Sequence, residues 1–270
     1  MPIWQAVILG IVQGLAEFLP ISSSAHLLLI PWAFGWEDPG LAFDVALHWG
    51  TLAAVLLVFW KDWIRLFSAG FFRRGTDTDR RLFWGIVVSA IPGAFAGKLL
   101  DQWAEKNLRA PLLIAGTLAA LGIILWVADR VGRKTRHLDE MTVGRAFGIG
   151  VAQAAALVPG VSRSGATISL GLFEGFTREE IARFSFLMST PIIFGAGLLK
   201  FPKMLHAMGA GEGNVTWAAL AAGFVAAAVV GAAVIRWMLD YLRRRTYAVF
   251  AVYRLALAAA IVVLWLSGKR

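Results

Sequence analysis

Long apolar runs separated by short charged loops dominate this chain of 270 residues. Hydrophobic residues make up 59% of it and charged residues only 16%, a balance that is typical of polytopic membrane proteins and excludes an ordinary soluble domain. Six runs have the roughly 17–25 residues that a membrane-spanning helix needs. No loop is long enough for a separate soluble domain, so we predict one integral membrane domain over 1–270 with an all-α fold. The predicted full transmembrane helices lie near 41–60, 82–99, 111–129, 182–200, 216–236 and 247–266.

Two further apolar segments, about 2–30 and 145–173, are broken near their middle by Pro, Ser and Gly. They carry the same polar motif at a fixed spacing of 140 residues. Broken apolar segments at corresponding places in two halves of a chain are typical of membrane proteins with a site near the bilayer midplane. The matching pairs are Gly10 and Gly150, Gln13 and Gln153, Ser22 and Ser162, and Ser24 and Ser164.

The distribution of basic residues predicts how these broken segments meet the bilayer. If 145–173 enters and leaves on one face, the loops on that face carry more than twice as many Lys and Arg as the opposite loops. This is the bias expected between cytoplasmic and outer loops, and a single crossing gives a weaker one. We therefore predict a re-entrant hairpin for 145–173 and, by the repeat, for 2–30, with both termini outside.

Three predicted spans separate the two motif copies, so the second half should be inserted upside down relative to the first. This arrangement is an inverted repeat of about 1–130 and 141–270. The two hairpins then enter from opposite faces, and their tips meet near the midplane. Non-helical backbone at that depth is tolerated only where it lines a polar cavity or is buried in protein, so we expect a cavity there.

The first tip combines a carboxylate, hydroxyls and an imidazole. Gln13 and Glu17 are four residues apart and share one face of a helix. A charged Glu17 costs about 2.5–3.5 kcal/mol on insertion scales, so a metal, a basic group or water should compensate it; a neighbouring helix is the structural alternative. His26 follows Ser23 by three residues, which suggests an activated nucleophile, although serines after a proline also cap helices.

The second tip, 159–165, offers a turn, free backbone amides, two hydroxyls and the guanidinium of Arg163. Amides at the start of a helix bind anions, and Arg binds phosphate oxygens in pairs. The tip therefore predicts a phosphate site. The alternative is that Arg163 only pairs with Glu17 and locks the two halves together.

Three other ionisable residues lie within predicted spans. Asp44 and His48 are four residues apart on one span, and they either reach the cavity or are hydrogen-bonded core groups. Arg254 lies inside the last span, where we expect it to snorkel or to pair, for instance with Asp240 or a carbonyl.

Residues 13–26, QGLAEFLPISSSAH, and residues 158–167, VPGVSRSGAT, closely resemble the two signatures of the bacterial undecaprenyl pyrophosphate phosphatase family, also called the bacitracin-resistance family. The resemblance covers the whole chain in length, order and spacing of segments. It implies an inner-membrane enzyme that hydrolyses undecaprenyl pyrophosphate to undecaprenyl phosphate and inorganic phosphate, which recycles the lipid carrier for cell-wall synthesis. It also implies an active site that opens to the outer side and a divalent cation, Mg²⁺ or Ca²⁺.

The resemblance assigns candidate roles to both tips. Two positions depart from the family pattern: Gln13 stands where Glu is frequent, which puts a two-carboxylate metal site in doubt, and Ser24-Ala25 stands where Thr-Gly is common. The catalytic candidates are Glu17, Ser23, His26 and Arg163, and the metal candidates are Glu17 and Gln13. The candidates for binding substrate phosphate are Ser22, Ser24, Gly160, Ser162, Arg163, Ser164, Gly165 and Thr167.

The expected partners are a polyprenyl pyrophosphate and membrane lipids. The net charge of +9 is spread over interhelical loops, which indicates anionic lipid and not nucleic acid. A homodimer is left open. The main rival function is a secondary transporter or polyprenyl-phosphate flippase, because inverted repeats with broken helices are common there. The other class of membrane lipid phosphatase also uses Ser, His and Arg but ranks third, because no second His is suitably placed after Arg163.

Overall fold

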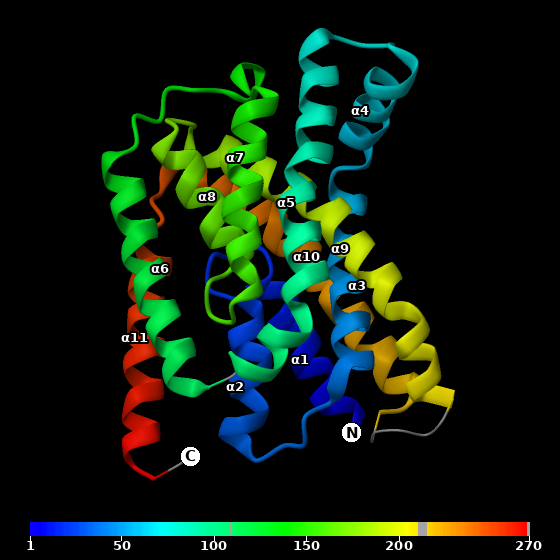
Figure 1. Cartoon of the computed structure of the whole chain (residues 1–270), viewed down its shortest axis with the longest axis vertical. Helices are drawn as coiled ribbons and strands as arrows, with labels where there is room; N and C mark the ends of the chain where they lie inside the picture. The colour runs from blue at the N-terminus through cyan, green and yellow to red at the C-terminus, as the bar shows by residue number, and fades with distance from the viewer. Residues whose placement is uncertain (109, 210–214, 269–270) are drawn as a thin grey trace.

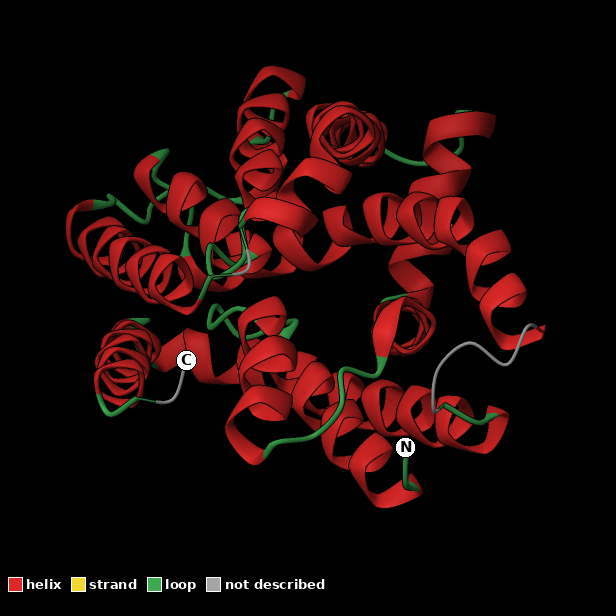
Figure 2. Ribbon diagram, turned by 60° about the horizontal axis from the view of Figure 1, so that its bottom comes forward, coloured by secondary structure: helices red, strands yellow, loops and turns green. Residues whose placement is uncertain are grey.

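The computed structural model describes residues 1–108, 110–209 and 215–268, which form α-helices, short 3-10 helices and loops, with no β-strand among them. The predicted all-α fold is confirmed, and Figure 2 shows helices and their connecting loops only. In chain order the elements are α1 (Ile3–Ala16), α2 (Ser23–Phe34), α3 (Gly40–Val58), α4 (Trp60–Phe72), α5 (Asp77–Asn107), α6 (Pro111–Val131), η1 (Leu138–Glu140), α7 (Val143–Ala154), η2 (Ala155–Leu157), α8 (Arg163–Phe173), α9 (Arg178–Gly209), α10 (Trp217–Arg244) and α11 (Ala248–Leu266).

Six helices of the described chain are long and apolar enough to cross a membrane, namely α3, α5, α6, α9, α10 and α11. Each coincides with one predicted span, so these predictions are confirmed. Several helices extend beyond the apolar run that revealed them. For example, α5 starts at a capping box in which the Thr76 hydroxyl accepts a hydrogen bond from the Asp79 amide, and α10 continues through its charged end to Arg244. The loop predicted between the first two spans also contains the amphipathic helix α4.

Each motif segment forms two helices joined by a sharp turn. The first turn connects α1 to α2, and the second connects α7 and η2 to α8. Ser22 and Ser162, which match in the repeat, are the N-cap residues of α2 and α8, and both have positive φ, 76° and 70°. A non-glycine residue rarely adopts this conformation, so its presence at matched positions indicates that the two turns share one backbone design.

The two turns approach each other from opposite ends of the molecule. In Figure 1, α1 and α2 occupy the lower half, α7 and α8 the upper half, and the turns meet between them. This arrangement is consistent with two re-entrant hairpins and an inverted repeat, which stay predictions because the structure contains no bilayer.

Helix packing follows the repeat. α1 packs against α10, and α7, its counterpart in the second half, packs against α5. Matched glycines make both contacts close: a Cβ at Gly10 would lie 2.5 Å from the Gly223 carbonyl oxygen of α10, and one at Gly150 would lie 2.3 Å from the Ser89 carbonyl oxygen of α5. The repeated glycines therefore let each first hairpin helix approach its partner backbone and hold the turn at a fixed depth.

Candidate active site

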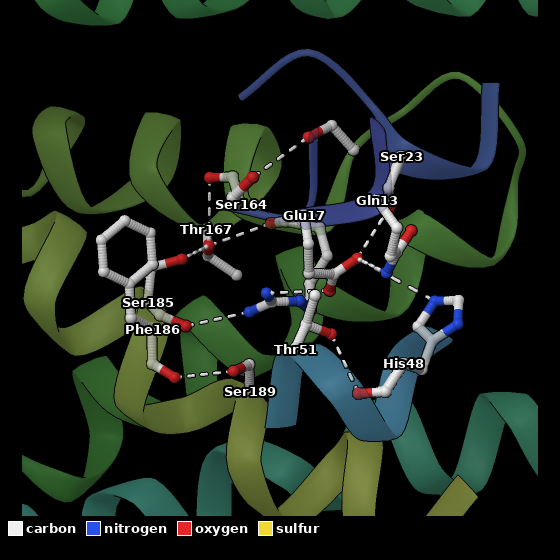
Figure 3. Close-up of polar contacts among 12 residues, drawn as sticks. Gln13, Glu17, Ser23, His48, Thr51, Ser164, Thr167, Ser185, Phe186 and Ser189 are labelled. Carbon is white, nitrogen blue, oxygen red and sulfur yellow. Dashed lines mark hydrogen bonds and ion pairs between the residues drawn. The ribbon is translucent and has the colours of Figure 1, made fainter. Parts of the chain in front are cut away.

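Glu17 is the centre of the polar contacts between the two turns (Figure 3). It follows the last residue of α1, and its side chain is only 6% exposed. Its Oε2 accepts hydrogen bonds from Gln13 Nε2 at 3.0 Å and from Ser23 Oγ at 2.7 Å, while its Oε1 accepts one from Arg163 Nη2 at 3.1 Å. The predicted meeting of an acid and a guanidinium across the two motif copies is therefore present.

Arg163 begins α8 and bridges the two halves of the chain. Besides its ion pair with Glu17, its Nη1 donates to the Ser185 carbonyl of α9 at 2.9 Å. Its Nε is buried and has no hydrogen-bond partner among the described residues. A buried donor without an acceptor costs free energy, so the guanidinium can gain a further acceptor when a ligand binds. The pair does lock the halves, as the structural alternative held, yet both side chains also line a pocket.

Neither ring nitrogen of His26 is hydrogen-bonded to Ser23, although the sequence suggested an imidazole beside that hydroxyl. Its Nδ1 is 2.7 Å from the Ser22 carbonyl oxygen, and its Nε2 is 2.7 Å from the hydroxyl of Tyr253 on α11, with which its ring stacks. Both ring nitrogens of His26 are therefore occupied by partners other than the Ser23 hydroxyl. The Ser23 hydroxyl instead donates its hydrogen bond to Glu17.

The imidazole that faces Glu17 belongs to His48 of α3. Its Nε2 lies 3.9 Å from Glu17 Oε2, and its Nδ1 lies 2.7 Å from the Asp44 carbonyl oxygen. His48 is partly exposed and lines the same pocket as Asp44 and Glu17. The sequence left these two residues open between cavity and core, and the structure places both at the cavity.

The serine, threonine and glycine candidates of the two turns divide into those that line the pocket and those that do not. Ser23, Ser24 and Ser162 line the pocket together with Arg163 and Glu17. The remaining phosphate-binding candidates, Ser22, Gly160, Ser164, Gly165 and Thr167, are not among the described residues that line it.

The candidates away from the pocket have internal roles. Ser164 Oγ donates to the Leu19 carbonyl of the opposite turn at 3.1 Å. Thr167 Oγ1 bonds Ser185 Oγ at 2.7 Å, and the Gly165 amide already donates to Ser162 Oγ at 3.1 Å. These contacts hold the two turns in place and leave the pocket-lining groups to meet a ligand.

Arg254 of α11 is hydrogen-bonded to both turns. Its side chain is fully buried, so it does not snorkel, and its partners are backbone carbonyls, which was one of the expected alternatives. Its Nη1 donates to Pro20 of the first turn at 3.1 Å and its Nη2 to Gly160 of the second at 2.8 Å. It also donates to Leu118 of α6 at 3.1 Å. A single guanidinium therefore satisfies carbonyls that both turns leave without helical partners.

The pocket between the turns has a volume of about 320 Å³ and two different walls. The polar wall contains the ionisable and hydroxyl groups of the turns together with Asp44 and His48 of α3 and Lys200 of α9. The apolar wall includes Val45 of α3 and Ile192 and Ala196 of α9. Such a pocket suits an amphiphilic ligand whose anionic head and apolar body are directly joined.

The side chains at this site could hold a divalent cation only together with oxygens of a bound ligand. No group of three or more His, Cys, Asp or Glu is placed to hold a metal among the described residues. However, the buried Gln13 Oε1 has no hydrogen-bond partner there, and it lies on the residue that contacts Glu17. Mg²⁺ is commonly held by one or two carboxylates together with substrate phosphates. Glu17 and Gln13 fit that mode, and they do not form a complete cage.

Comparison with known proteins gives matches along nearly the entire chain. A family model described as bacitracin resistance protein BacA matches residues 6–260. An undecaprenyl-diphosphatase from Moorella thermoacetica is 53% identical over 268 residues, which cover 98% of this chain and 99% of the relative. Undecaprenyl-diphosphatases from Desulforudis audaxviator and Rubrobacter xylanophilus are 47% and 48% identical, with 97% of this chain covered in each case and 97% and 98% of the relatives. This chain therefore belongs to the bacitracin resistance protein BacA family.

Proposed function

We propose that this chain hydrolyses undecaprenyl pyrophosphate to undecaprenyl phosphate and inorganic phosphate. Its relatives carry the name of that activity, which favours hydrolysis over transport. The observation that carries the proposal is the contact of Ser23 Oγ and Arg163 Nη2 with the two oxygens of one buried carboxylate, Glu17, at the polar wall of the pocket.

Arg163 binds the pyrophosphate in this mechanism. Its unpartnered Nε–H and its Nη groups present donors in the planar arrangement that matches phosphate oxygens. Its bond to the Ser185 carbonyl fixes the guanidinium before the substrate arrives, so little side-chain ordering accompanies binding. Ser162 and Ser24, which also line the pocket, add hydroxyl donors.

Ser23 is the proposed nucleophile and Glu17 the proposed base. The Ser23 oxygen attacks the terminal phosphorus as its proton passes to Glu17 over their 2.7 Å hydrogen bond. The bond between the terminal phosphorus and the bridging oxygen breaks, and undecaprenyl phosphate leaves with the proton that Glu17 took from Ser23, so that Glu17 is again a carboxylate. Water then attacks the phosphoserine, its proton is taken by Glu17, and inorganic phosphate leaves as Ser23 regains a proton. Direct attack by water with Glu17 as base is the alternative.

Glu17 and Gln13 are the residues that would hold a divalent cation together with the substrate. Mg²⁺ or Ca²⁺ would neutralise charge on the phosphate oxygens. His26, bonded to Tyr253, then supports the turn from the far side and does not act on the nucleophile.

We further propose that the pocket opens to the outer side of a bacterial inner membrane. It lies toward the ends of α3 and α9 that carry few basic residues, whereas Arg178, Arg183 and Arg243 mark the opposite ends of α9 and α10. A homodimer stays a prediction, to be tested by the mass of the detergent-solubilised protein.

The experiment is phosphate release from undecaprenyl pyrophosphate by the purified protein in detergent, with Mg²⁺ or Ca²⁺ and with EDTA. We expect turnover with either cation, little turnover with EDTA, and recovery when the cation is restored. An enzyme needs no sealed compartment, whereas a transporter does. Absence of phosphate release from folded protein with every cation would contradict the proposal.

A further inference from the structure

A second hollow lies beside the catalytic pocket, between α3, α9 and α10. Its volume is about 280 Å³, and its lining is apolar throughout apart from the indole N–H groups of two tryptophans. Leu220 and Ala221 of α10 form one wall, and Phe201 of α9 forms another. We call this hollow the α10 groove. Its volume lies at the low end for small-molecule pockets, so it would take only part of a long chain.

The α10 groove and the catalytic pocket share one wall. Val45 of α3 lines both. Trp49, one helical turn later, lines the groove and rests on Gly197 of α9, which lines the pocket. A Cβ at Gly197 would lie only 2.1 Å from Trp49 Nε1, so the glycine is what allows the indole to lie against α9. The indole is therefore the partition between the two spaces.

Within the described part of the chain, no hydrogen bond fixes the Trp49 indole. Trp49 Nε1 is buried and has no hydrogen-bond partner among the described residues. The ring is held by aromatic packing, with centroids 6.1 Å from Phe194 and 6.2 Å from Phe201. Rotation of the indole would therefore break no hydrogen bond with the described residues.

We propose that the α10 groove binds the isoprene units of the substrate that lie next to the pyrophosphate, with Trp49 forming the wall over which the chain leaves the catalytic pocket. The inference rests on the proposed function. In a polyprenyl pyrophosphate the phosphate is bonded directly to the apolar chain, so an apolar subsite must begin where the polar wall ends, and Val45 marks that place.

The gain from such a subsite is positional. Lipid is as apolar as the groove, so transfer of the chain from lipid contributes little by itself. Holding the first isoprene units fixes the direction of the scissile bond relative to Ser23 and Arg163, and small misplacements of a reacting group reduce rates strongly. The groove therefore acts on substrates that carry isoprene units and not on a pyrophosphate without them.

The test fills the groove without touching the pocket. Ala221 lines the groove and is exposed, so Ala221→Trp adds volume there without entering the core. Ala218→Trp is the matched control, because Ala218 is also exposed on α10 but is not among the residues that line the groove. Both variants are assayed with undecaprenyl pyrophosphate and with inorganic pyrophosphate, which carries no isoprene unit.

We expect Ala221→Trp to lower kcat/KM for undecaprenyl pyrophosphate about tenfold, and Ala218→Trp to stay within about twofold of the parent protein. With inorganic pyrophosphate both variants should match the parent. Equal activities of the two variants on the long substrate would overturn the inference. A parent protein that releases no phosphate at all would instead count against the proposed function.

A second measurement needs no variant. A polyprenyl pyrophosphate analogue with a photoreactive group on its first isoprene units is irradiated with the parent protein, and the adducts are mapped by mass spectrometry. We expect adducts on α10 near Leu220 and on α9 near Phe201. Adducts confined to other helices would overturn the inference.

Discussion

Replacement of Arg163 by lysine separates charge from geometry at the centre of the site. The lysine ammonium keeps the positive charge that compensates Glu17, but it is a single point with no planar arrangement of donors. Arg163 uses Nη1 on the Ser185 carbonyl and Nη2 on Glu17, and its Nε remains for a ligand. One ammonium cannot make all of these contacts at once.

The size of the loss follows from the number of donors removed. Removing one preorganised donor to a developing anion lowers kcat by about 100- to 1,000-fold, or about 2.7–4 kcal/mol. Arg163→Lys loses at least the donor available through Nε, so we expect kcat/KM to fall by that amount. Its thermal stability should stay close to that of the parent, because Glu17 keeps a counter-charge.

The assay is phosphate release in detergent, paired with a thermal-unfolding measurement on the same samples. Arg163→Gln is the informative comparison. It leaves the buried Glu17 charge without its ion-pair partner, and breaking a buried pair in this way costs about 3–5 kcal/mol of stability. Near-parental phosphate release by Arg163→Lys would refute the argument that paired donors grip the substrate.

Three further predictions concern the turns and their supports. Ser23→Ala should abolish phosphate release while Ser24→Ala retains most of it, because Ser23 donates to Glu17 whereas the Ser24 hydroxyl is bonded to that of Ser22. Slow but clear hydrolysis by Ser23→Ala would favour direct attack by water. Arg254→Met should lower activity and melting temperature together, because the carbonyls of both turns lose a shared donor. Each buried carbonyl left without a partner costs about 1–3 kcal/mol of stability. An unchanged melting temperature would contradict the role of Arg254 in holding the turns together. Gly150→Ala should lower the melting temperature, because a Cβ there would lie 2.3 Å from a backbone oxygen. Gly116→Ala is the control and should leave the melting temperature unchanged, because a Cβ at Gly116 would meet open space. Equal melting temperatures of the two variants would count against close packing of α7 on α5.

The parts of this fold that the sequence predicted are those set by local pattern. Hydropathy located the six long helices because apolar length alone distinguishes a span. The four-residue spacing of Gln13 and Glu17 predicted their shared helix face, and the two side chains are hydrogen-bonded. The helix α4 was missed because its charged residues made it read as a loop, although its apolar residues follow a helical period.

The parts that the sequence did not predict depend on distant residues. His26 was expected beside Ser23, but its ring is directed by Tyr253, which lies 227 positions later in the chain. The five carbonyl contacts of Arg254 come from three separate segments, and no spacing in the sequence reports which of them meet. His48 had a signal in its spacing from Asp44, yet only packing of α3 beside the first turn decides that it faces Glu17.

The buried guanidinium of Arg254 bears on whether this architecture can work by alternating access. A rocking cycle would have to part the two turns, and parting them would strip Arg254 of either Pro20 or Gly160 and Val161 while the charge stayed in a low-dielectric interior. Each such movement would cost several kcal/mol of free energy, because the buried guanidinium would lose part of its compensation. Inverted repeats with broken helices are common in transporters, but the contacts of Arg254 with both turns favour a rigid enzyme over a carrier that alternates between two states.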